Sequence, residues 1–106
     1  MILIFQGKGY LSVACYQDTK GFFSQLPTAY THLAPTPVPE TIIEAVSDSD
    51  DRSKVWITIL SICILKKYFQ DSEDEWTLIS KKAEAYLKQM KVKNYRQEIK
   101  SALSLV

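Results

Sequence analysis

A run of apolar residues at positions 55–65, between Lys54 and Lys66, constrains the fold more than any other feature of this sequence. Its eleven residues are too few to cross a bilayer, which requires about 20. Apolar side chains recur at three- and four-residue steps, and further apolar residues fill the opposite side. The first set is Trp56, Ile59, Leu60, Cys63, Ile64 and Tyr68, and the second is Ile57, Ile62 and Leu65. The β-branched residues would also fit a strand, but the spacing favours a central, buried helix that begins near Ser53.

The length of 106 residues, with 46% hydrophobic and 24% charged residues, is typical of one small globular domain. We expect a single helical domain over residues 1–106, with an irregular N-terminal segment and Pro-rich loop over 1–39 and a helical core over 40–106. The net charge of +1 gives no overall argument for a nucleic acid, a membrane surface or a polyanionic substrate. Cys15 and Cys63 lack C-x-x-C spacing, and the apolar start of the chain lacks the basic region of a signal peptide. These features predict free thiols, no membrane association and a cytoplasmic location.

The N-terminal third of the sequence gives mixed local signals. Residues 1–16 fit either two short strands joined by a turn or a helix end followed by a hairpin. Asp18 is expected to cap a short helix that ends by Pro27, since proline interrupts the backbone hydrogen bonds of a helix. Two prolines within residues 28–38 predict an ordered surface loop there.

Three more helices are expected in the C-terminal two thirds. Pro39 suits the first position of a short amphipathic helix over residues 40–46, which the acidic run at 47–51 should end as a loop. Ser72 and Glu75 have the spacing of a capping box, which predicts the start of a strongly amphipathic helix. Asn94 is expected to open a short fifth helix.

The apolar stripes of the last two helices complete the expected core. They comprise Trp76, Ile79, Ala83, Tyr86, Leu87 and Met90 in the fourth helix, and Ile99, Ala102, Leu103 and Val106 in the fifth. The predicted fold class is therefore mostly α: a small helical bundle of about five helices with a short irregular or β N-terminal segment.

No set of residues in the sequence has the pattern of a catalytic, cofactor or metal site. His32 is the single histidine and has no partner at ligand or dyad spacing. The glycines around Lys8 lack the rest of a dinucleotide-binding or phosphate-binding loop. The acids at 71–75 lack the glycine and the alternating spacing of a calcium loop, and helix capping accounts for them. We therefore expect no enzymatic activity, no metal and no cofactor.

Charge separates along the sequence. Residues 40–75 hold nine acidic and four basic residues, whereas residues 76–106 hold two acidic and seven basic ones. The candidate partner-binding residues are the seven bases: Lys81, Lys82, Lys88, Lys91, Lys93, Arg96 and Lys100. They could form a basic docking face, or they could be solvated helix faces that neutralise the acidic segment. Nucleic-acid binding is the alternative function, with Tyr86 or Tyr95 stacking on bases.

Three segments, taken in order, resemble a known family. They are Leu3-Ile4-Phe5-Gln6 with Gly9-Tyr10; Lys54-Val55-Trp56-Ile57-Thr58-Ile59-Leu60-Ser61-Ile62; and Asp74-Glu75-Trp76-Thr77-Leu78-Ile79 with Lys82-Ala83-Glu84-Ala85-Tyr86-Leu87. The order and content are similar to the C-terminal region of cytosolic proteins that pair a VIT domain with a von Willebrand factor A domain. The C-terminal vault-interaction region of vault poly(ADP-ribose) polymerase is related to it. The Val-Trp-x-Thr and Asp-Glu-Trp-x-Leu-Ile blocks are the specific part.

The resemblance implies a helical accessory or docking module rather than an enzyme. It implies a protein partner, with a large cytosolic assembly such as the vault particle as one possibility. No catalytic residue is carried over, because the family assigns none to this region. The expected function is thus a non-catalytic protein-protein interaction scaffold, part of or derived from a larger protein of that family.

Overall fold

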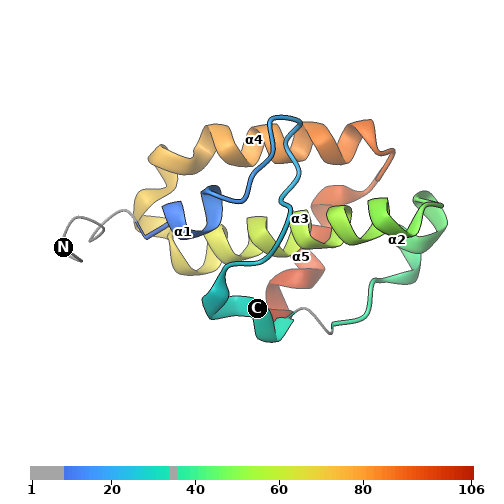
Figure 1. Cartoon of the computed structure of the whole chain (residues 1–106), viewed down its shortest axis with the longest axis horizontal. Coiled ribbons are helices and arrows are strands. Elements are labelled where there is room, and N and C mark those ends of the chain that lie inside the picture. The colour runs from blue at the N-terminus through green and yellow to red at the C-terminus, as the bar shows by residue number, and fades with distance from the viewer. Residues whose placement is uncertain (1–8, 34–35) are drawn as a thin grey trace.

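A computed structural model describes residues 9–33 and 36–106 of the chain. Within them the helices are, in order, α1 (Leu11–Ala14), the 3-10 helix η2 (Thr28–Leu33), α2 (Glu40–Ala45), α3 (Ser49–Tyr68), the 3-10 helix η3 (Gln70–Ser72), α4 (Glu73–Gln89), α5 (Tyr95–Ala102) and the 3-10 helix η4 (Leu103–Leu105). The predicted fold class is confirmed: the domain is a small, mostly α bundle (Figure 1).

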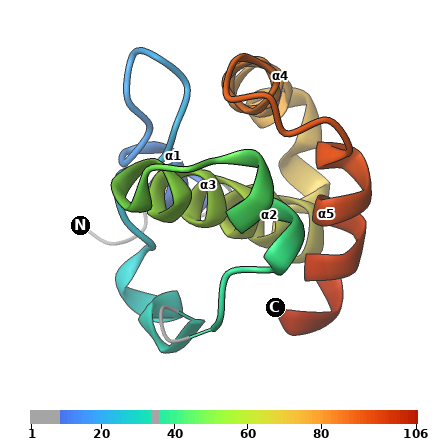
Figure 2. The same ribbon diagram turned by 90° about the vertical axis from the view of Figure 1, so that its right-hand side faces the viewer.

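Helix α3 is the central helix, as the apolar run predicts. It packs against α1, α2, α4 and α5, and Figure 2 shows it end-on between them. All positions of the apolar run except Ile57 are buried, including the hydroxyl-bearing Thr58 and Ser61. Tyr68 was expected on the core face, but in the last turn of α3 it is 49% exposed, with the ring of Tyr30 5.4 Å away between centroids.

The start of α3 differs from the expectation. The predicted loop over 47–51 is wrong, since its last three residues form the first helical turn. The carboxylate of Asp48 accepts hydrogen bonds from the amides of Asp50 and Asp51, at 2.9 and 3.1 Å. Acidic side chains are favourable at this position because they face the positive end of the helix dipole. The run therefore starts a helix as well as ending the previous one.

Helices α4 and α5 follow their predicted stripes. Ser72 is the N-cap of α4, as expected, but its hydroxyl makes no hydrogen bond to the first-turn amides, and its own amide donates to the Phe69 carbonyl. The Ser72 hydroxyl therefore does not make its part of the predicted capping box. Asn94 likewise precedes α5 without a side-chain cap. Both helices are fixed by their buried faces, with Trp76 2% exposed and Leu87 fully buried.

The predicted helix after Asp18 is wrong, because the chain forms a hairpin-like loop there. Gln17 and Phe23 make an isolated antiparallel bridge, and the Asp18 carboxylate accepts from the Lys20 amide. Gly21 has a φ of 107°, which a helix does not allow. The loop carries Phe23 into the core, where its amide donates to the Thr58 hydroxyl on α3 at 3.0 Å.

The segment before α2 also contributes to the core. Buried side chains there are Tyr10, Val13, Phe23, Leu26 and Leu33, so the core is not confined to residues 40–106. Of residues 1–16, the structure describes 9–16, which contain the short helix α1, and the hairpin-like loop follows at 17–23; positions 1–8 lie outside the described residues. The expected loop over 28–38 begins with the 3-10 helix η2, and Pro39 is the N-cap of α2 rather than its first residue. Among the described helices, none is long and apolar enough to span a membrane.

Candidate docking surface

All seven candidate cations are exposed, and the fold brings three of them around one hollow. Lys88 at the end of α4, Lys93 in the connection and Arg96 at the start of α5 line a depression of about 490 Å³. Amide side chains of Asn94 and Gln97 line the same depression. We call Lys88, Lys93 and Arg96 the basic cluster. It presents three positive charges together with amide side chains, which can donate hydrogen bonds.

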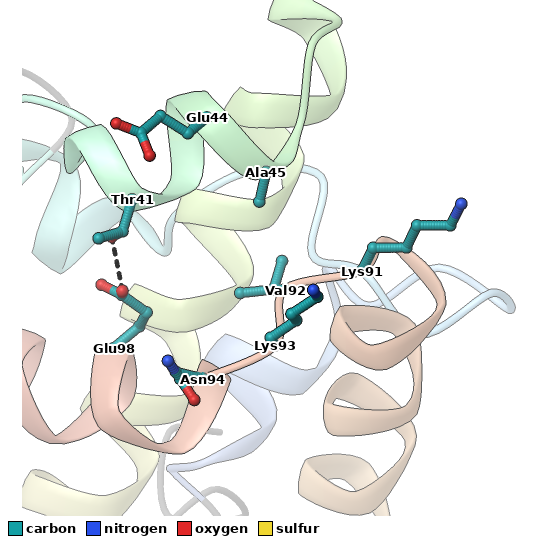
Figure 3. Close-up of a pocket in the computed structure, with 8 residues that line it drawn as sticks. All are labelled: Thr41, Glu44, Ala45, Lys91, Val92, Lys93, Asn94 and Glu98. Atoms are coloured by element: carbon teal, nitrogen blue, oxygen red, sulfur yellow. Dashed lines mark hydrogen bonds between the residues drawn. The ribbon is translucent and has the colours of Figure 1, made fainter.

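The remaining candidate cations are distributed around this cluster. Lys100 lines a second hollow together with Arg96 and with Lys66 of α3. Lys91 lines a third hollow, between α2 and the α4–α5 connection, which Lys93 also lines and where Glu44 and Glu98 bring negative charge (Figure 3). Lys81 and Lys82 lie on α4 and line none of these three hollows. The structure therefore gathers part of the predicted face and leaves the other part separate.

The turn after α4 positions the basic cluster. Lys91 adopts a φ of 64°, and its amide donates to the carbonyl of Lys88. The amide of Val92 reaches back to the carbonyl of Leu87, at 3.1 Å, and both of these side chains are buried. These are the two hydrogen bonds and the apolar contact of a Schellman motif. The motif reverses the chain at the end of α4, so that Lys93 and Arg96 return toward Lys88.

Within the described residues, the basic cluster has one carboxylate at 4.0 Å, and Lys93 also shares the third hollow with Glu44 and Glu98. Arg96 Nε lies 4.0 Å from Glu84 Oε1, and the Arg96 side chain is 83% exposed. In the described parts of the chain, no carboxylate lies within 4.0 Å of any of the six candidate lysines. An exposed pair at this distance contributes little to stability. The cluster's charge is therefore available to a partner.

The two tyrosines proposed to stack on bases are buried, so that part of the nucleic-acid hypothesis is wrong. Tyr86 is 6% and Tyr95 7% exposed. Tyr86 packs against Phe22 with ring centroids 5.3 Å apart, and burial, reinforced by Asp51, raises its pKa to about 12. Tyr95 lies under the Arg96 guanidinium, 5.7 Å from the ring centroid. Both rings are therefore part of the hydrophobic core.

The described residues hold no group of three or more His, Cys, Asp or Glu side chains that could bind a metal ion. His32 is exposed on η2, where its ring lies 6.5 Å from that of Tyr30. Cys63 is fully buried, and its thiol donates to the carbonyl of Ile99. Burial raises the pKa of Cys63 to about 12, a shift that Lys66 partly opposes. At neutral pH this thiol is protonated and inert as a nucleophile. The glycine-rich stretch around Lys8 lies outside the described residues, apart from Gly9.

Comparisons with family models, with curated proteins and with solved structures yield no match to this chain. The relationship to proteins with VIT and von Willebrand factor A domains thus stays a prediction from the segments quoted above. Of the residues that carry it, Val55, Trp56 and Thr58 on α3 and Trp76 on α4 are buried. Asp74, Glu75 and Leu78 of the second block are exposed, so the resemblance covers both core and surface positions of α3 and α4.

One strongly exposed apolar residue was not among the candidate partner-binding residues. Leu78 on α4 is 78% exposed, although it lies between two residues of the apolar stripe. The signal was present in the sequence, since Leu78 is two positions after Trp76 and so faces away from the stripe that Trp76 and Ile79 define.

Proposed function

We propose that this domain is a non-catalytic docking module that binds an acidic segment of a protein partner through the basic cluster. The observation that carries the proposal is the convergence of Lys88, Lys93 and Arg96 on one hollow with little neutralisation by nearby carboxylates. Complementary charge accelerates association and selects the partner, and the asparagine and glutamine amides of the hollow can hydrogen-bond to peptide groups.

A protein partner is favoured over a nucleic acid by the burial of the aromatic rings. Proteins that bind single strands without sequence preference combine a basic groove with exposed aromatic side chains. Tyr95 lines the hollow of the basic cluster, but it is only 7% exposed. Acidic side chains require cations and hydrogen-bond donors but no stacking surface.

The family resemblance adds a hypothesis about context. If the chain is part of, or derived from, a larger protein with VIT and von Willebrand factor A domains, its partner belongs to a large cytosolic assembly, for which the vault particle is the candidate. The support is the resemblance of two segments, one in α3 and one in α4, whose tryptophans are core residues. The cytoplasmic location is proposed on the same basis.

The test is capture of partners from cell lysate by the immobilised domain, with and without nuclease and at about 50 and about 300 mM salt, which changes the screening length roughly twofold. The variant Lys88→Glu/Lys93→Glu reverses two charges of the cluster. The matched control is Lys20→Glu/Lys67→Glu, which makes the same change in net charge at two exposed lysines outside the hollow.

We expect a nuclease-resistant protein that is retained by the wild type and the control and lost by the cluster variant. Equal retention by the two variants would refute the role of the cluster. Loss of the captured protein after nuclease treatment would instead indicate that the domain binds nucleic acid.

A further inference from the structure

The basic cluster offers more positive charge and more hydrogen-bond donors than one carboxylate can use. Lys88, Lys93 and Arg96 come from the end of α4, the connection and the start of α5, and all three line one hollow of about 490 Å³. The Arg96 side chain is 83% exposed, so its planar guanidinium is free to turn toward a ligand. A guanidinium donates two parallel hydrogen bonds to an anion that has several oxygens. The cluster therefore suits an anion with more oxygens and more charge than a carboxylate.

The carboxylates around the cluster leave a net positive charge. Among the described residues that line the hollow, none is acidic, and Glu84 Oε1 lies 4.0 Å from Arg96 Nε. Lys93 also lines the third hollow, but there the Glu98 carboxylate accepts from the Thr41 hydroxyl on α2 at 2.6 Å (Figure 3). Counting Glu84 against the three cations leaves two positive charges. A phosphate monoester carries about −1.5 to −2 charges near neutral pH, together with three strong acceptor oxygens.

The start of α5 adds hydrogen-bond donors to the same hollow. Asn94 and Gln97 line it, and Asn94 is the N-cap residue, yet its side chain makes no capping hydrogen bond. Among the described residues, the backbone amide of Gln97 has no acceptor, whereas the next amide, of Glu98, donates to the Asn94 carbonyl. An N-cap side chain would ordinarily satisfy such an amide. The donors of α5 thus supplement the three cations.

We propose that the basic cluster binds a phosphorylated serine or threonine in the acidic segment of the partner, an inference that rests on the proposed function. Lys88 and Lys93 supply charge from two sides of the hollow, and Arg96 supplies the planar pair of donors. A phosphate monoester is favoured over the phosphodiester of a nucleic acid because it carries the second negative charge that the cluster can neutralise. Recognition of phosphorylated segments by clustered cations is a general mode of peptide binding.

The first experiment compares three synthetic peptides of glycine and glutamate that differ only at the central residue, which is phosphoserine, serine or glutamate. Binding is measured by calorimetry, and the amide signals are followed by nuclear magnetic resonance. The phosphoserine peptide should bind at least about tenfold more tightly than the other two, because a phosphate accepts more charge-assisted hydrogen bonds than a carboxylate. The amide signals of Arg96 and Gln97 should shift most.

Two variants test the donors without removing a packing contact. Asn94→Asp places a carboxylate of nearly the same shape at the start of α5, where it competes for the Gln97 amide and repels phosphate. It should weaken binding of the phosphoserine peptide at least about tenfold without lowering the melting temperature, since aspartate is a good N-cap. The matched control is Gln25→Glu, which makes the same change in charge at an exposed amide outside the hollow and should bind as the wild type does.

The second variant is Arg96→Lys, which keeps the charge and loses the planar fork. The preference for phosphoserine over glutamate should fall at least about threefold, whereas affinity for the glutamate peptide should stay the same. An unchanged preference in both Arg96→Lys and Asn94→Asp would overturn the assignment of the phosphate to this hollow.

Three outcomes would overturn the proposal as a whole. They are equal affinity for the three peptides, absence of binding to any of them, and tighter binding of a single-stranded oligonucleotide than of the phosphoserine peptide. Phosphatase treatment of the lysate separates this proposal from the proposed function. A partner that survives the treatment but is lost by Lys88→Glu/Lys93→Glu would overturn the role of phosphate and leave the docking function in place.

Discussion

Replacing Gly21 by alanine should destabilise the domain severely, because the loop that carries Phe23 depends on this glycine. Gly21 has a φ of 107°, where an L side chain is strained. A Cβ atom at this position would lie 2.4 Å from the carbonyl oxygen of Lys82 on α4. That oxygen belongs to the helix backbone, so it cannot move away as the end of a flexible side chain could. The loop itself must move.

The magnitude follows from what the loop would lose. Backbone strain at such a φ costs about 1–3 kcal/mol. Moving the loop also breaks the two hydrogen bonds from Gln17 Nε2 to the carbonyls of Gly21 and Ile79, each worth about 0.5–1.5 kcal/mol. We expect a loss of about 3–5 kcal/mol, a large part of the roughly 5–15 kcal/mol that stabilises a domain.

The assay is urea unfolding followed by circular dichroism, with Gly9→Ala as the matched control. A Cβ at Gly9 would lie 2.9 Å from the edge of the Phe69 ring, which can rotate, and Gly9 does not have a positive φ. The control should cost about 1 kcal/mol or less. If Gly21→Ala were as stable as Gly9→Ala, the argument that the loop is held against α4 by a glycine-specific contact would be refuted.

Three further predictions concern single side chains. Thr58→Val removes the oxygen that accepts from the buried Phe23 amide and should lower the unfolding free energy by about 1–3 kcal/mol. The control Thr77→Val removes an exposed hydrogen bond to the Glu73 carbonyl and should lower it by about 0.5 kcal/mol or less. Urea unfolding measures both variants. Lys91→Gly should stabilise the domain by up to about 1 kcal/mol because it relieves the φ of 64°, and Lys93→Gly, at a position without positive φ, should not; a rise in both melting temperatures would contradict this. The pKa of Cys63 is raised from 9.0 to about 12, so the folded state keeps a proton that the unfolded state releases as the pH rises. The unfolding free energy should fall by about 1 kcal/mol between pH 9 and 10 for the wild type and should be flatter in Cys63→Ala, as measured by unfolding at each pH.

The positions of the helices could be predicted where the pattern is local. The apolar residues around Trp56 and in the stripe that begins at Trp76 recur with the helical period. Only a helix places residues at that spacing on one face, where they can be buried together. Their ends were harder to place. Asp48 caps α3 because its carboxylate meets the first-turn amides, yet acids in such a run could equally be solvated in a loop.

The loop at residues 17–23 could not be predicted from its own residues. Asp18 followed by apolar side chains suits a helix cap, and it equally suits the turn that the chain adopts. The choice depends on distant residues, because Phe23 is held by Thr58 and the Gly21 backbone lies against Lys82. A hydrogen bond across 35 positions of the chain leaves no trace in the local pattern.

The candidate surfaces likewise depend partly on the local sequence and partly on tertiary packing. The order of residues was enough to show a helical bundle without a catalytic motif and an excess of bases after position 76, because periodicity and charge are properties of neighbouring residues. The grouping of Lys88, Lys93 and Arg96, and the burial of Tyr86 and Tyr95, depend on the turn at Lys91 and on how α5 folds back against α3 and α4. Packing brings together side chains from separate helices, and no single helix specifies which of them will meet.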